Sequence, residues 1–76
     1  MTIPRIIKSK IAARGMSQGS LAEASGFNGQ SNISMFLRSG EKMKVSNLMA
    51  MLEALDCELV VRDNVTGESI TISHKD

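Results

Sequence analysis

Glycines at positions 15, 26 and 40 divide the first half of the chain into segments of about ten residues, and this spacing constrains the fold more than any other feature. Apolar residues recur at helical spacing within these segments. Ile7 and Ile11, for example, are four residues apart and therefore share one helix face. Glycine commonly ends a helix because it adopts positive φ without steric cost. The pattern therefore predicts several short helices.

Local signals indicate where these helices begin. Pro4 suits a first helical turn, where its missing N–H would be unpaired in any case. Ser17 is a candidate N-cap, although the acidic residue expected three positions later in a capping box is absent, because Ser20 stands there. The strongest helical period is that of Leu48, Met51, Leu52 and Leu55. The predicted helices cover about residues 4–14, 18–25, 30–38 and 45–55.

The pattern changes after residue 56. The stretch Leu59-Val60-Val61 is rich in β-formers, residues 63–67 are typical of a turn, and Ile70-Thr71-Ile72 alternates apolar and polar side chains. These features predict a β-hairpin over about residues 58–73, with strands near 58–62 and 68–73. The whole chain, residues 1–76, is therefore expected to be a single, mainly α domain with a C-terminal hairpin.

Composition excludes some classes of protein and sites. A chain of 76 residues buries a small core, so dimerisation would be a natural supplement to its stability. Cys57 is the only cysteine, which excludes an internal disulfide and fits a reducing cytosol. No apolar stretch is long enough for a signal peptide or a membrane span, so we expect a cytoplasmic protein without a membrane partner.

Charge is distributed unevenly along the chain. Residues 1–44 carry seven basic and two acidic side chains, a net charge of +5, whereas residues 45–76 carry two basic and six acidic side chains, a net charge of −4. The overall net charge of +1 hides this division. The basic half predicts a surface that faces an anion, and the acidic half predicts a different partner or role.

The second and third predicted helices are separated by a short turn. Phe27-Asn28-Gly29 lies in that turn, and Asn and Gly both accept left-handed backbone angles. Two short helices joined in this way have the layout of a helix-turn-helix, in which the later helix reads DNA.

The ordered set of residues in this region resembles a known family. It consists of Ser17-Gln18-x-x-Leu21-Ala22, then Gly26, then Ser31-Asn32-Ile33-Ser34, then Gly40. This set is similar to the helix-turn-helix domain of the lambda-type phage repressors, Cro and their bacterial relatives, the XRE family. The resemblance covers about residues 5–56. It implies a four-helix lambda-repressor-like domain, here followed by the hairpin. The stretch from Gly26 to Ser34 is one residue longer than the commonest family spacing, which leaves the register of the reading helix open.

The resemblance implies a set of base-reading residues at the start of the third helix. Gln30 matches the family's leading base-reading position, and its amide suits the N6/N7 edge of adenine. Asn32 has the same chemistry, Ser31 and Ser34 carry hydroxyl donors, and Met35 could touch a thymine methyl group or pack in the core.

The resemblance also implies contacts to the phosphate backbone. Gln18 matches a family glutamine that contacts phosphate and braces the reading helix from the start of the second helix. The basic candidates for phosphate contacts are Lys8, Lys10, Arg38, Lys42 and Lys44.

These expectations lead to one preferred function and two alternatives. The preferred function is a sequence-specific double-stranded DNA-binding transcriptional regulator, of the Cro or repressor kind found in phages and mobile elements. Operators are usually read by dimers, so we expect a homodimer that uses the hairpin or the fourth helix, unless the hairpin merely covers the core. The first alternative is an antitoxin whose acidic residues 53–68 bind a toxin while the domain autoregulates its operon. The second is a protein-interaction module with a degenerate helix-turn-helix.

The sequence offers no catalytic constellation, so we expect neither an enzyme nor a cofactor. His74 is the only histidine and lies in the predicted tail. Cys57 lacks a basic neighbour in sequence, and no cluster has metal-ligand spacing. The methionines of the fourth helix region are expected to serve packing.

Overall fold

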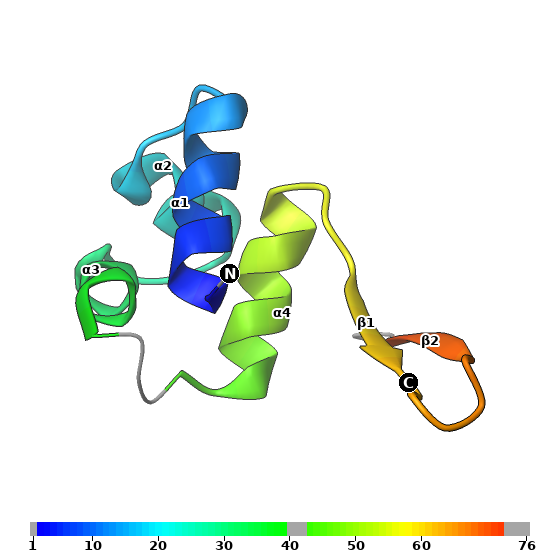
Figure 1. Ribbon diagram of the computed structural model, residues 1–76. Coiled ribbons are helices and arrows are strands. Elements are labelled where there is room, and N and C mark those ends of the chain that lie inside the picture. Colours follow the sequence, from blue (N-terminus) through cyan, green and yellow to red (C-terminus); the bar gives the residue numbers. More distant parts are fainter. Residues whose placement is uncertain (1, 40–42, 73–76) are drawn as a thin grey trace.

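The computed structural model describes residues 2–39 and 43–72 and is mainly helical, with one hairpin at its C-terminal end (Figure 1). Each predicted element is present, and the ends of the helices lie within one residue of the predicted ends. The elements are α1 (Ile3–Ala13), α2 (Gln18–Ala24), α3 (Ser31–Ser39), α4 (Val45–Ala54), β1 (Leu59–Arg62) and β2 (Ser69–Ile72).

Three of the helices end in the same hydrogen-bonded motif. After α1, the N–H of Met16 donates to the carbonyl of Ile11 at 3.0 Å, and Gly15 between them has φ 65°. After α2, Gly26 has φ 81°, so both glycines stop their helices as predicted. After α4 the motif repeats with Asp56 at φ 57° in the place of glycine. This third ending could not be predicted from the sequence, because an L-residue rarely adopts this conformation.

Two local expectations are corrected by the structure. Asn28 and Gly29 do not adopt positive φ, since the left-handed residue of this connection is Gly26 alone. The capping box at α2 is complete without an acidic residue. Ser17 Oγ accepts from the N–H of Ser20 at 3.0 Å, and Ser20 Oγ accepts from the N–H of Ser17 at 2.8 Å. The hydroxyl of Ser20 therefore accepts the hydrogen bond that a Glu or Gln side chain usually accepts at this position.

The core lies where the four helices meet. Each helix contributes the residues that its apolar period predicts, and no polar or charged residue of the described part of the chain is buried with them. The buried residues are Ile7, Ile11, Leu21, Ala22, Ile33, Phe36, Leu37, Met51, Leu52 and Leu55. Arg14 adds a tie between helix ends, because its Nε donates to the carbonyl of Leu55 at 3.2 Å.

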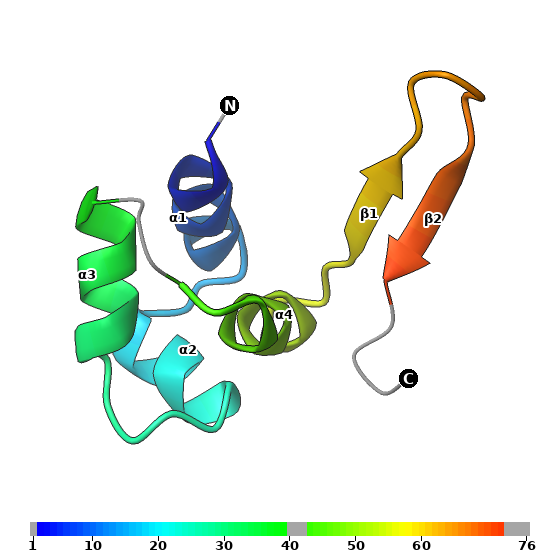
Figure 2. The ribbon, with the colours of Figure 1, turned by 90° about the horizontal axis from the view of Figure 1, so that it is seen from below.

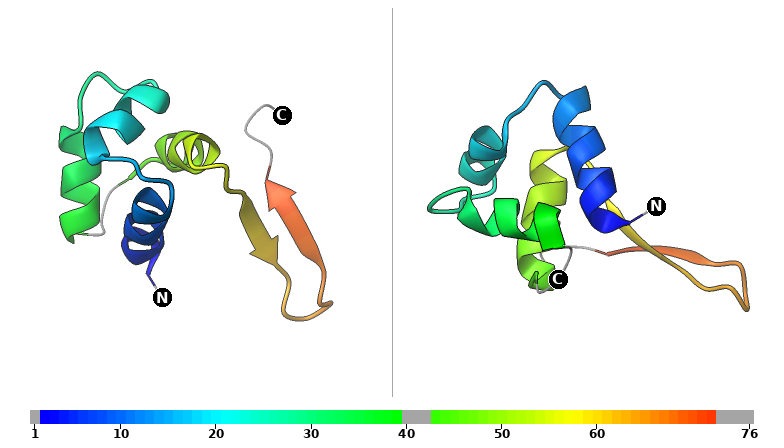
Figure 3. Two further views of the ribbon diagram at one scale, coloured as in Figure 1. Left: turned by 90° about the horizontal axis from the view of Figure 1, so that it is seen from above. Right: turned by 60° about the vertical axis from the view of Figure 1, so that its left-hand side comes forward.

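The hairpin extends away from the helices instead of covering their core (Figures 1 and 3). The radius of gyration is 12.9 Å, above the value of about 11 Å typical of a compact domain of this length. Of the described hairpin residues, only Leu59, at the start of β1, packs against the core cluster. Within the described residues, no helix is both long enough and apolar enough to cross a membrane.

Candidate nucleic-acid interface

Helix α3 is apolar on one side and exposed on the other. Ile33, Phe36 and Leu37 are buried against the other helices. Ser31, Met35 and Arg38, which are spaced i, i+4 and i+7, form what we call the outer face of α3. The sequence left open whether Met35 packs in the core or lies on the surface. Its side chain is 56 % exposed, so it lies on the surface. Figure 2 shows α3 at the edge of the helical cluster.

Gln18 and Ser34 join α2 to α3 along one flank of the outer face. The hydroxyl of Ser34 donates to Oε1 of Gln18 at 2.5 Å, and both residues are partly buried. Gln18 therefore braces α3 as the family resemblance implied. Ser34 was expected to read bases, but its hydroxyl proton is donated to Gln18 instead.

Gln30 lies on the same flank but just before α3, not inside it as predicted. Its carbonyl accepts from the N–H of Ser34 at 2.9 Å, which makes Gln30 the residue that precedes the first helical turn. Its side chain reaches back toward α2, because a Cβ placed on Gly19 would lie 3.0 Å from Oε1 of Gln30.

Asn32 lies on the opposite flank, toward α4. One open hollow there is lined by Asn32 and Asn47 together with the loop residues Phe27 and Asn28. A second hollow, on the other side of Asn32, is also lined by Asn47 and includes Lys44. Lys44 was predicted as a phosphate contact, whereas Asn47 was missed. The only signal for Asn47 was its polarity in the first turn of a largely apolar helix.

The predicted phosphate-binding cations are only partly brought together. Arg38 lies at the C-terminal end of α3, beside Arg5 and Lys8 of α1. Lys10 lies in the last turn of α1 and lines none of the hollows beside α3. Lys42 lies outside the described residues.

No group of three or more His, Cys, Asp or Glu side chains in the described part of the chain could hold a metal ion. Cys57 is partly buried and its thiol lies 3.5 Å from the carbonyl of Leu55. His74 lies outside the described residues.

Comparison with known proteins leaves the chain without an assigned family: no protein-family model matches it, and neither the curated proteins nor the solved structures include a significant match.

Proposed function

We propose that the protein is a sequence-specific double-stranded DNA-binding regulator with the layout of the lambda-type repressors and Cro. The observation that carries the proposal is the outer face of α3, a polar and exposed surface on a helix whose opposite side is held in the core. An α-helix fits the major groove, where each base pair presents a distinct pattern of donors and acceptors.

Base reading falls to the residues at the exposed start of α3. Gln30, Ser31 and Asn32 supply donors and acceptors there, and Asn and Gln amides suit adenine. Met35 supplies an exposed apolar group one turn later, which suits a thymine methyl. The brace between Gln18 and Ser34 ties this part of α3 to α2, so that the backbone of α3 is already positioned before binding.

We further propose that the regulator is a homodimer and that the hairpin forms its interface. In the antiparallel register, Leu59 lies opposite Ile72 and Val61 lies opposite Ile70, which places four apolar side chains on one face. Val61 and Ile70 are 50 % and 51 % exposed. An isolated two-stranded hairpin is only marginally stable in water, so a second copy packed on this face would stabilise it. A dimer would also supply the second reading helix that half-sites about 34 Å apart require.

A binding experiment tests the DNA-reading part of the proposal. A preferred duplex would first be selected from a random library, and the DNA upstream of the protein's own gene would be included. Gln30→Ala and Asn32→Ala should each weaken binding to that duplex by about 1–3 kcal/mol and relax the preference at one base pair. The matched control is Asn64→Ala, because Asn64 is exposed in the hairpin turn, far from α3. Unchanged affinity and preference in both variants would refute the assignment.

The oligomeric state tests the hairpin interface. Ile70→Lys places a charge on the apolar face and should convert the dimer to a monomer in light scattering. Thr71→Lys is the control, because Thr71 and its partner in the register, Val60, lie on the opposite face of the hairpin and the new charge faces no other charge. A wild-type protein that is monomeric at high micromolar concentration would contradict the proposed dimer.

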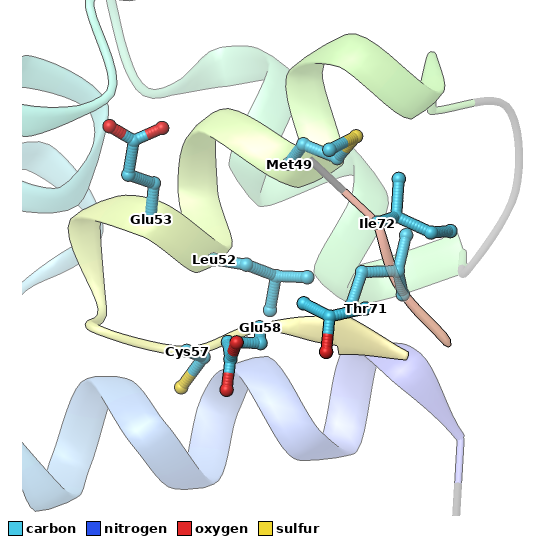
Figure 4. Close-up of a pocket in the computed structure, with 8 residues that line it drawn as sticks. Met49, Leu52, Glu53, Cys57, Glu58, Thr71 and Ile72 are labelled. Carbon is cyan, nitrogen blue, oxygen red and sulfur yellow. The ribbon is translucent and has the colours of Figure 1, made fainter. Parts of the chain in front are cut away.

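The antitoxin function remains a second candidate because of a groove between α4 and the hairpin (Figure 4). Met49, Leu52 and Ile72 give this groove apolar walls, and Glu53 and Glu58 border it. Such a surface is complementary to a partner that is both apolar and basic. An antitoxin should relieve the growth arrest caused by the product of a neighbouring gene. Glu58→Lys should abolish that relief without changing DNA binding. Glu23→Lys, on α2, should leave the relief of growth arrest intact.

A further inference from the structure

Three cations from two helices converge on one hollow at the C-terminal end of α3. Arg5 and Lys8 come from α1, and Arg38 comes from the last turn of α3. The remaining lining residues are uncharged, namely Thr2, Pro4, Leu37 and Ser39. We call this place the cationic hollow. The sequence alone did not connect these residues, since Arg5 and Arg38 are 33 positions apart.

The charges of the cationic hollow are not compensated within the described part of the chain. Neither α1 nor α3 contains an acidic residue, and Arg5, Lys8 and Arg38 have no ion pair there. All three side chains belong to exposed residues, so they can reach a ligand without rearrangement of the core. Like charges held close together repel one another, and a bound anion would relieve this repulsion.

The N-terminus of α1 adds to the positive potential of the cationic hollow. Thr2 precedes the helix but its side chain makes no capping hydrogen bond, and the first turn carries no acidic residue. The N–H groups of Ile3 and Arg5, which have no partner within the helix, and the dipole at this end favour an anion, whereas the C-terminal end of α3 opposes it. This contribution supports the cations but is secondary to them.

The position of the cationic hollow relative to the outer face of α3 decides which anion it suits. Helix α3 has nine residues, which corresponds to a length of about 13 Å. The major groove is about 12 Å wide. When the start of α3 reads bases, its other end, with the cationic hollow, therefore comes close to the sugar–phosphate backbone at the edge of the groove.

We propose that the cationic hollow binds a backbone phosphate of the duplex, held jointly by Arg5, Lys8 and Arg38. This inference rests on the proposed DNA-binding function. It adds Arg5 to the interface and joins it with Lys8 and Arg38 in one site. Because phosphate is present in every sequence, this contact positions the protein and contributes nothing to base preference.

The experiment measures duplex affinity of the full chain as a function of salt concentration. The probes are the selected duplex and a random-sequence duplex of the same length. Arg5→Gln and Arg38→Gln should each weaken binding to both probes by the same factor. If the two residues share one phosphate, the double variant should lose less than the product of the two single losses. The slope of log K against log salt should fall in magnitude by about 0.9 in the double variant, the value for one phosphate contact. The matched control is Arg62→Gln, which removes the same charge from the hairpin.

The outcomes separate this inference from the function on which it rests. If wild-type protein binds neither duplex at low salt, the proposed function and the inference both fail. If wild-type protein binds but the double variant retains its slope, or behaves like Arg62→Gln, only the cationic hollow is refuted. A titration with inorganic phosphate identifies the source of the phosphate. Amide NMR shifts at residues 5, 8 and 38 are the readout, and chloride at equal ionic strength is the control. Shifts caused by inorganic phosphate but not by duplex would overturn the assignment to DNA.

Discussion

The hydroxyl of Ser34 donates a hydrogen bond of 2.5 Å to Oε1 of Gln18, and this bond links the first turn of α2 to the exposed helix α3. The two residues are 16 positions apart, so the link exists only because the two helices pack together. In the proposed interface, this bond holds Gln18, the candidate phosphate contact, at a constant position relative to α3, the candidate reading helix.

Removal of this bond should weaken both stability and DNA binding. Ser34→Ala should lower the free energy of unfolding by about 0.5–1.5 kcal/mol, the usual net value of a hydrogen bond. The control is Ser46→Ala on an exposed position of α4, because it reports the gain in helix propensity without the loss of a bond. Urea denaturation measures the difference between the two variants. Equal stability changes in both would show that the bond contributes nothing.

Gly19 should set the position of the Gln30 amide. Gly19→Ala would place a Cβ 3.0 Å from Oε1 of Gln30, so the end of the glutamine side chain must move. Ala also restricts the unfolded chain, and we expect stability to rise by about 0.4–1 kcal/mol. If Gln30 reads a base, the preference at one base pair should change while the salt dependence of binding stays the same. If the base preference of Gly19→Ala is identical to that of wild type, Gln30 does not read a base.

Asp56 should be a position where glycine stabilises the protein. It has φ 57° at the end of α4, where α1 and α2 have glycine in the same motif. An L-residue pays roughly 1–2 kcal/mol in this conformation, although Asp tolerates it better than most. Asp56→Gly should therefore raise the melting temperature. Asp56→Val should lower it, because a β-branched side chain is poorly suited to positive φ. A decrease with glycine would show that the carboxylate has a further role.

The hairpin turn should weaken in acid. The N–H groups of Val65 and Thr66 donate to Oδ1 of Asp63 at 2.9 and 3.3 Å, and these bonds lower the pKa of Asp63 below its ordinary value of 3.8. A depressed carboxylate pKa stabilises the folded state at pH values above the ordinary pKa, and this contribution is lost as pH falls through the lower, folded value.

Amide NMR shifts of Val65 and Thr66 should follow this titration, with a midpoint below pH 3.8. Asp63→Asn keeps an oxygen acceptor but cannot ionise, so in this variant the Val65 and Thr66 amide shifts should not change with pH over the same range. A midpoint at or above the ordinary value in wild-type protein would contradict the depressed pKa.

The sequence by itself determined the helices, their buried faces and the hairpin. Pro4, Gly15 and Gly26 act within one turn of their own position, and the Ile7–Ile11 spacing sets which face of α1 is buried. Local signals of this kind depend on the backbone of a few neighbouring residues, so they can be found without knowledge of the rest of the chain. The residues proposed for base reading also come from an ordered local motif, and that assignment stays a prediction; Gln30 lies one residue before α3 instead of at its first position.

Only the tertiary structure decided which distant side chains share a surface. It paired Ser34 with Gln18, placed Asn47 beside Asn32, and brought Arg5 and Lys8 to Arg38. It also left the outer part of the hairpin's apolar face, Val61 and Ile70, exposed, an outcome on which the alternation of residues in β1 and β2 is silent. The physical reason is common to all these cases. Helix period and turn chemistry determine how each segment buries its own apolar side, whereas polar and charged neighbours on the surface depend on how the segments pack against one another.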